Sequence, residues 1–244
     1  MSNWYGSLFI VLSASALAIC GCGPRLPVHP WRGHDLALRS IVHRAELLET
    51  LTAECRLILT RPDGTSTQLR GALVARMPGY FRLRGWKLSQ PVFDVTLTPQ
   101  GLWVFAADLT GGDPLQSLPA ERIVDAWSRL SAGIVDPSWD PLPDLDRRRF
   151  RVGQDVSSSD APTNCAIDRS TFTIRECEFV ADEDAARLAL RMDRYKVIDG
   201  HVWPLRIDLL SDHGQVTLLL DDVSINGEIS EGAFQPPRRA IRKR

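Results

Sequence analysis

The sequence lacks an excess of charge of either sign. Its 29 lysines and arginines stand against 30 aspartates and glutamates, for a formal net charge of −1. A general nucleic-acid binder normally carries a basic excess, so this balance argues against nucleic acid as a partner.

Long apolar runs are also missing. The longest extends from Leu8 to Cys20, whereas a helix needs about 20 residues to cross a bilayer, which argues against a polytopic membrane protein.

The motifs of common enzyme classes are missing as well. The sequence contains no G-x-S-x-G, H-E-x-x-H, P-loop or G-x-G-x-x-G pattern, and no Cys/His spacing that indicates zinc. His201 beside Asp199 is the one histidine in a setting that suggests acid–base chemistry, and a hairpin surface explains that pair more simply. We therefore expect no catalytic residue, metal or cofactor, and keep a hydrolase only as an alternative.

The first 24 residues contain no Lys, Arg, Asp or Glu, and their apolar run has the length of a secretory h-region. It ends at Ile19-Cys20-Gly21-Cys22, which resembles a bacterial lipobox with Cys22 as the acylated cysteine. The resemblance implies a lipoprotein signal peptide over residues 1–21 and a lipidated, proline-containing tether over residues 22–34. Because the first residues carry no Lys or Arg, an uncleaved signal anchor and a buried apolar segment stay open as alternatives.

Three further cysteines follow the proposed lipidation site. Cys165 and Cys177 are 12 positions apart, which makes them a candidate disulfide in an oxidising compartment. Cys55 stands in a segment of alternating apolar and polar residues and is interpreted as a buried thiol.

Two segments have helical periodicity, and the rest of the chain alternates as strands do. The helices are expected at residues 35–53 and 119–131. Because they do not alternate with the strands, a parallel sheet is not expected. The sequence predicts a mainly β (α+β) fold, a curved antiparallel sheet with helices across one side. Pro204 lies inside an expected strand, which predicts an edge of the sheet or a bulge at that position. The strands are expected at residues 54–61, 67–77, 80–86, 92–98, 102–106, 147–153, 170–181, 186–198, 201–211 and 215–226.

Two stretches carry a resemblance to a known family. YFRLRGWKLSQPVFDVTLTPQGLWVFAAD follows the lipobox and the first helix, and YKVIDGHVWPLRIDLLSDHGQVTLLLDDVSIN, later followed by FQPP, comes near the end of the chain. In the order of their elements and in their residue pattern, they resemble the LolA/LolB-type family of bacterial lipoprotein carriers and receptors over residues 35–237. The matching positions in the closing strands are Tyr195, Gly200, Trp203-Pro204, Leu218–Leu220, Asn226 and Phe234-Gln235-Pro236-Pro237.

This resemblance implies a single domain over residues 35–237, followed by a basic tail over 238–244. The domain would be an unclosed antiparallel half-barrel with helices over its opening and an apolar cavity that binds acyl chains. Burying acyl surface there gains about 25 cal/mol per Å². The alternative, that the wall residues only pack against the two helices, stays open, because alternation does not reveal what covers a face. The candidate wall residues are Phe81, Leu83, Phe93, Val95, Leu97, Trp103 and Phe105, with Leu188, Leu190, Leu218 and Leu220 from the second half.

The acylated cysteine and its neighbour extend the expectation to location and partners. Cys22 agrees with the anchored, receptor-like branch of the family, and Gly23 in place of aspartate favours the outer membrane. We expect a membrane-anchored periplasmic lipoprotein whose ligand is an acyl chain or a lipoprotein, acting in trafficking to or at the outer membrane. The alternative is a structural or assembly lipoprotein of the envelope with a filled core and a protein partner. The loops at 132–146 and 154–164 have no assigned role.

Overall fold

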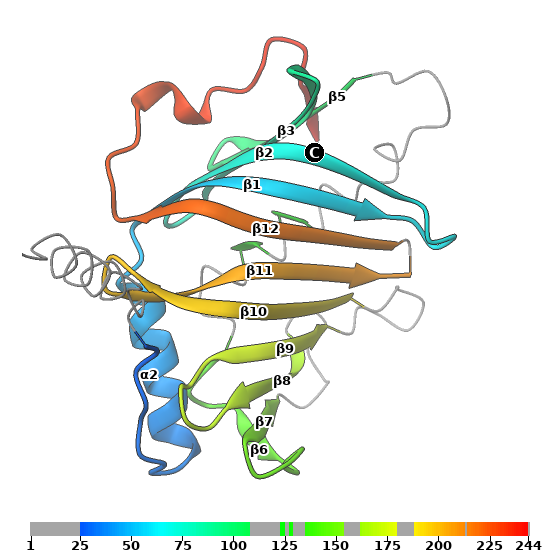
Figure 1. Ribbon diagram of the computed structural model, residues 1–244. Coiled ribbons are helices and arrows are strands. Elements are labelled where there is room, and N and C mark those ends of the chain that lie inside the picture. The colour runs from blue at the N-terminus through cyan, green and yellow to red at the C-terminus, as the bar shows by residue number, and fades with distance from the viewer. Residues whose placement is uncertain are drawn as a thin grey trace, which may run out of the picture.

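The computed structural model describes residues 25–107, 123–124, 127–128, 135–153, 162–179, 188–212 and 214–243 (Figure 1). Residues 1–24, with Cys22, lie outside these ranges. The described helices are α2 (His34–Glu46) and the short 3-10 helix η2 (Glu231–Phe234). No helix within these ranges has both the length and the apolar composition to cross a membrane. The strands are β1 Thr50–Thr60, β2 Ser66–Arg76, β3 Tyr80–Lys87, β4 Gln90–Thr98, β5 Gly101–Ala106, β6 Asp140–Leu142, β7 Arg149–Gly153, β8 Pro162–Asp168, β9 Ile174–Phe179, β10 Leu188–Ile198, β11 His201–Ser211, β12 Gly214–Ile225 and β13 Ile241–Lys243.

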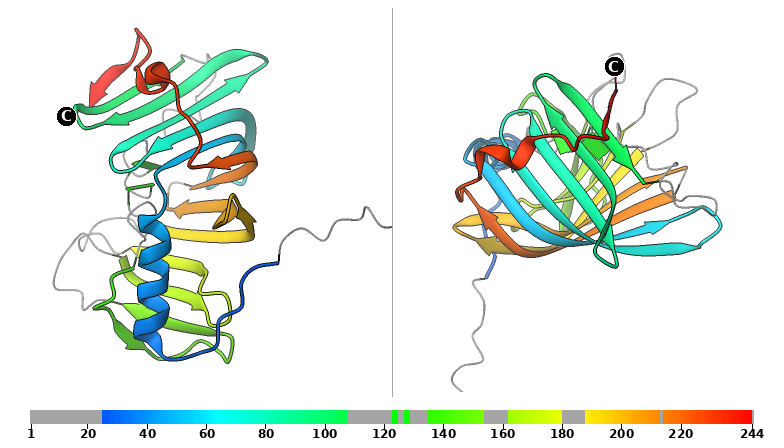
Figure 2. Two further views of the ribbon diagram at one scale, coloured as in Figure 1. Left: turned by 90° about the vertical axis from the view of Figure 1, so that its left-hand side faces the viewer. Right: turned by 90° about the horizontal axis from the view of Figure 1, so that it is seen from above.

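These strands form one antiparallel sheet in the order β13-β5-β4-β3-β2-β1-β12-β11-β10-β9-β8-β7-β6. It consists of two meanders, β1–β5 and β6–β12, which the pairing of β1 with β12 joins into a single curved sheet (Figure 2). The prediction of a mainly β, antiparallel, curved sheet is confirmed. The two meanders agree with the hairpin-rich character of both halves of the sequence, because each neighbouring pair within a meander needs only a local turn.

The sheet has an apolar inner face and a polar outer face. We call inner the side that carries Leu57, Leu83 and Val95, which are at most 2% exposed and belong to one core cluster with Ala37, Leu38 and Ile41 of α2. In Figure 2 this helix stands across the strands of the second meander. The outer face carries the alternate positions, among them Arg82 and Asp94.

A row of glycines lets the first meander pack tightly. Cross-strand pairing aligns Gly71 of β2 with Gly85 of β3, and Gly85 with Phe93 of β4. A Cβ atom on Gly71 would lie 2.3 Å from Leu57 Cδ1, and one on Gly85 would lie 2.3 Å from Phe93 Cε1. Side chains of the neighbouring strands therefore lie directly on bare backbone, which is the close approach that glycine permits within a sheet.

The first helix is shorter than the sequence predicted. It ends at Glu46, and β1 begins at Thr50, so the prediction of helix over residues 35–53 is wrong at its end. Asn226, directly after β12, holds the connection. Its Oδ1 accepts hydrogen bonds from the backbone N–H groups of Glu49 (2.8 Å) and Thr50 (3.2 Å), and its Nδ2 donates to Leu47 O (2.9 Å). No local sequence pattern predicts this partner, because Asn226 lies far from Leu47, Glu49 and Thr50 in the sequence.

Both ends of the described chain pack on the sheet. In the described part of the expected tether, His29 N donates to Ser170 O (2.7 Å), and the His29 ring stacks on Phe172 with centroids 4.8 Å apart. The expected basic tail contains β13, which pairs with the edge strand β5. Aromatic stacking therefore holds one end of the described chain, and the edge of β5 takes up the other.

Pro204 lies in an interior strand, β11, and still agrees with the prediction of a local edge. Strand β12 pairs with β11 only from Arg206 to Ser211, whereas β10 pairs along the whole of β11. Pro204 therefore stands where β11 has a paired neighbour on one side only, and its missing N–H leaves no ladder bond unmade.

Candidate functional site

The inner face brings together side chains from both meanders. Phe81 pairs with Leu97 and Leu83 with Val95 across β3 and β4. Across the junction of the meanders, Leu218 pairs with Leu57. The predicted wall residues Phe81, Leu83, Phe93, Val95, Leu97, Leu188, Leu190, Leu218 and Leu220 share this apolar face, and only Leu97 and Leu218 among them are half-buried.

Trp103 and Phe105 of β5 do not belong to this wall. Trp103 pairs with Thr96, and Phe105 pairs with Asp94, so both share the outer face with those polar residues. The inner positions of β5 are Leu102 and Val104, which pack against the core. Every residue from 102 to 105 is apolar, so alternation cannot define a face in this strand, and only the pairing with β4 decides it.

Part of the second expected helix covers the centre of the inner face. Of residues 119–131, the structure describes 123–124 and 127–128, which are helical. The Trp127 ring lies 5.0 Å from Phe81 and 6.2 Å from Trp203, centroid to centroid. Beneath this cover lies a cavity of about 30 Å³, lined by Leu73, Phe81, Ile123, Trp127, Leu190, Ile207, Leu209, Val216 and Leu218.

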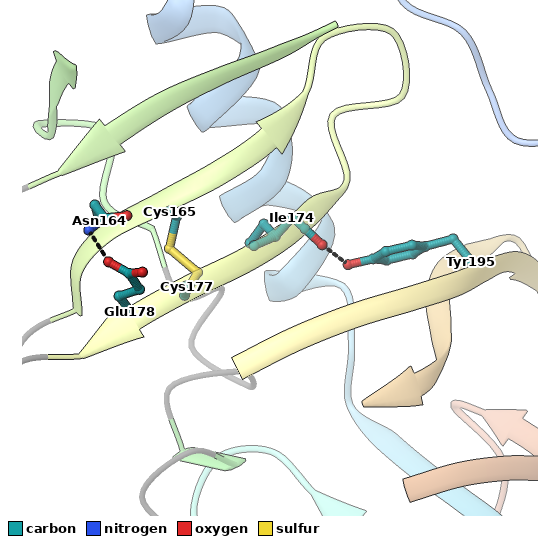
Figure 3. Close-up of a disulfide and its surroundings, with 6 residues drawn as sticks. All are labelled: Asn164, Cys165, Ile174, Cys177, Glu178 and Tyr195. Atoms are coloured by element: carbon teal, nitrogen blue, oxygen red, sulfur yellow. Dashed lines mark hydrogen bonds between the residues drawn. A yellow bond between two sulfur atoms is a disulfide. The ribbon is translucent and has the colours of Figure 1, made fainter. Parts of the chain in front are cut away.

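A second cavity, of about 90 Å³, lies between α2 and the hairpin of β10 and β11. Its apolar lining includes Ile41 and Leu48, and two of its polar side chains are engaged with backbone. Arg44 Nη1 donates to Thr171 O (3.3 Å), and the Tyr195 hydroxyl donates to Ile174 O (Figure 3). Burial lowers the pKa of Arg44 and raises that of Tyr195, so each shift disfavours the charged form of its group.

Both cavities are small for a lipid. An apolar cavity of about 150 Å³ binds a single benzene molecule, and each of these two cavities is smaller than that. An acyl chain can therefore enter only if part of the cover, such as Trp127, moves off the sheet. In this structure the inner face is therefore an apolar surface that side chains such as Trp127 cover.

The residues considered for catalysis have structural partners. Asp199 Oδ2 accepts the backbone N–H of Ile225 (3.0 Å), and His201 Nε2 lies 3.2 Å from Asn226 Nδ2. Among the described residues, no three His, Cys, Asp or Glu side chains converge in a way that could hold a metal ion. These contacts explain Asp199 and His201 as parts of a hairpin that is tied to the end of β12.

The cysteines form one disulfide and one free thiol. Cys165 of β8 and Cys177 of β9 pair directly across the two strands and are joined by a disulfide (Figure 3). Both are fully buried, so the bond ties the second meander together from within the core. Cys55 is a free thiol on the inner face, 4% exposed, in agreement with its interpretation as a buried thiol.

The Cys55 thiol is expected to be unreactive in the folded protein. Burial, with a smaller contribution from Asp221 and Glu54, raises its pKa from 9.0 to about 12. Because the thiolate is the reactive form, labelling by a disulfide reagent at pH 8 should be about a thousandfold slower than in urea. Ellman's reagent on the chain from residue 23 should detect one thiol after unfolding. Rapid labelling without urea would contradict the burial of this side chain.

The fold and the site together define a class of protein: a long, open, curved antiparallel sheet with an apolar inner face against which helix α2 packs. No protein-family model and no curated protein matches the chain. Several solved structures do match it. One is a domain from Vibrio parahaemolyticus described as an outer membrane lipoprotein-sorting protein, with 16% identity and a TM-score of 0.59 over 82% of this chain and 95% of that one.

Two further structures share the fold. A DUF1329 family protein from Desulfovibrio piger has 13% identity and a TM-score of 0.57, over 82% of this chain and 95% of its own. A LolA superfamily protein from Nitrosomonas europaea has 14% identity and a TM-score of 0.54, over 81% and 96%. At such identities the likeness concerns the fold, and the fold of this chain is LolA-like, as the sequence resemblance predicted.

Proposed function

We propose that this protein is a non-catalytic, membrane-anchored lipoprotein of the bacterial envelope that binds the acyl chains of lipids or lipoproteins on its inner face. The observation that carries the proposal is the continuous apolar face that β3, β4, β10 and β12 build together. An acyl chain needs no more than such a wall, because each Å² of its surface that leaves water contributes about 25 cal/mol. The proposed anchor is a diacylglyceryl group on Cys22.

The cover over this face supports a binding site that opens. Trp127 lies against Phe81 and Trp203 through ring contacts, which an acyl chain can replace without leaving a polar group unpaired. The LolA-like fold of the lipoprotein-sorting domain from Vibrio parahaemolyticus agrees with a role in lipoprotein or lipid trafficking at the outer membrane. Filling of the inner face by the protein's own side chains, with a protein partner elsewhere, is the competing function.

Native mass spectrometry with a palmitoylated peptide tests the proposal. The chain from residue 23, exported to a periplasm and purified without detergent, should retain a lipid or take up the peptide. Leu97→Asp should weaken uptake at least about tenfold, because a carboxylate on the inner face must be desolvated by the bound chain. Trp103→Asp is the matched control on the neighbouring strand, half-buried like Leu97 but on the outer face, and should bind as the wild type does.

The competing function predicts a different set of results. A wild-type chain that carries no lipid and takes up no peptide would show that the inner face is a permanent core. Equal loss of uptake in Leu97→Asp and Trp103→Asp would mean that uptake depends on general stability and not on this face.

A further inference from the structure

The N-terminal segment joins two turns of the second meander in one surface. His29 N donates to Ser170 O (2.7 Å) in the turn between β8 and β9, and Arg169 N donates to Arg148 O (2.8 Å) in the loop between β6 and β7. The Arg169 guanidinium lies 4.8 Å from the Trp31 ring centroid and forms an ion pair with Asp144. We define the N-terminal patch as the exposed apolar and arginine side chains of the N-terminal segment and the β6–β7 loop: Arg25, Val28, Trp31, Arg32, Leu145, Arg147 and Arg148.

This patch combines exposed apolar side chains with arginines that have no acidic partner. Val28 is 75% exposed, Leu145 48% and Trp31 38%. The four arginines of the patch are also exposed, and no ion pair joins any of them to a carboxylate in the part of the chain that the structure describes. Two acids of the β6–β7 loop are already engaged, since Asp146 pairs with Arg149, and Asp144 pairs with Arg169. The patch therefore has uncompensated positive charge around an apolar centre.

Such a composition fits the surface of an anionic bilayer. Tryptophan and aliphatic side chains partition into the headgroup region, while arginines near the surface are attracted to anionic lipids. The position of the patch along the chain also agrees with contact to a membrane. Cys22 precedes His29 by seven residues, which span at most about 25 Å when extended. An acyl anchor on Cys22 would therefore hold the membrane surface within reach of the patch.

We propose that the N-terminal patch docks on the anionic phospholipid surface in which the protein is anchored. The inference rests on the anchoring part of the proposed function, and it assigns an orientation: the end of the sheet formed by β6–β9 faces the bilayer. The β1–β5 meander, at the other end of the sheet in Figure 1, then extends away from the membrane. Anchor and patch together supply the two signals that stable membrane attachment needs.

Vesicle sedimentation tests this surface without the anchor. The unacylated chain from residue 23 contains every residue that the structure describes. It should bind vesicles of equal parts phosphatidylglycerol and phosphatidylcholine at least about tenfold more tightly than pure phosphatidylcholine. The double variant Arg147→Glu/Arg148→Glu should lose about tenfold or more of that binding. Arg238→Glu/Arg239→Glu is the matched control: it makes the same charge change at two adjacent exposed arginines in the C-terminal segment, and should bind like the wild type.

A second readout reports the orientation directly. Brominated phosphatidylglycerol should quench part of the tryptophan emission of the full acylated chain in vesicles, and Trp31→Phe should remove that part. Uptake of the palmitoylated peptide, measured on the same variants, should be unchanged, which separates this inference from the binding site on the inner face. Equal vesicle binding by both double variants, or quenching unaffected by Trp31→Phe, would overturn it even where peptide uptake is intact.

Discussion

Replacing Asp94 by alanine is expected to lower the free energy of unfolding by about 3–5 kcal/mol. The Asp94 side chain is 4% exposed, and its Oδ2 lies 2.7 Å from Nη2 of Arg82, whose side chain is 11% exposed. Thr96 Oγ1 also donates to Asp94 (2.8 Å), and Arg82 Nη1 donates to Ala233 O (2.7 Å) in the segment that crosses the outer face. Without the carboxylate, the guanidinium stays buried and uncompensated.

Urea unfolding measures this loss, and a double variant identifies its cause. Because the penalty comes from the unpaired charge, Arg82→Met/Asp94→Leu should recover most of the stability that Asp94→Ala loses. A comparison with Asp221→Ala, which breaks the exposed pair with Arg56, should show a loss of less than about 1 kcal/mol. A double variant no more stable than Asp94→Ala would mean that the buried pair itself stabilises the fold.

Replacing Trp127 by alanine is expected to lower stability and to raise ligand uptake. The indole is 7% exposed and contacts rings of both meanders, so its loss should cost about 3–5 kcal/mol. The same ring occupies the space that an acyl chain would enter. Removing it shifts the population toward the open inner face, and the apparent affinity for the palmitoylated peptide should rise at least about tenfold. Peptide titration by native mass spectrometry and urea unfolding measure the two effects.

The two readouts separate a binding site from a core. Saturating peptide should restore part of the lost stability, because it binds only the folded state. Trp103→Ala, on the outer face, should leave uptake unchanged, and Trp127→Leu covers the case in which the alanine variant does not fold. Loss of stability with no gain in uptake in both Trp127 variants would favour the structural or assembly lipoprotein.

Several features of the fold could be predicted from local sequence. Alternation located the long strands, and the residues between them, such as Pro78-Gly79 and Asp199-Gly200, are typical of the turns that close hairpins. Together they specify an antiparallel meander, because neighbouring strands joined by tight turns can pair in no other way. The apolar positions of β3 and β4 were assigned to one face correctly, since a polar residue separates each from the next along its strand.

Elsewhere the local pattern was ambiguous or misleading. In β5 every side chain from Leu102 to Phe105 is apolar, so the face of Trp103 was assigned wrongly. The strands β6, β8 and β13 were not predicted, because they are short or lie next to loop-like sequence. Residues 50–53 were assigned to a helix, although Asn226, far along the chain, ends α2 and fixes the start of β1. These outcomes depend on partners that are distant in sequence.

The sequence by itself determined the class of this protein: a mainly β chain with local antiparallel pairing, one strongly apolar face and a resemblance to LolA/LolB-type proteins. Only the tertiary structure decided that the two meanders join through β1 and β12, which side chains share the inner face, and that both ends of the described chain lie against the sheet. The physical reason is the range of the interactions. Alternation and turns act between neighbours, whereas the pairing of Leu57 with Leu218 and the stacking of His29 on Phe172 arise only after the chain has closed long loops.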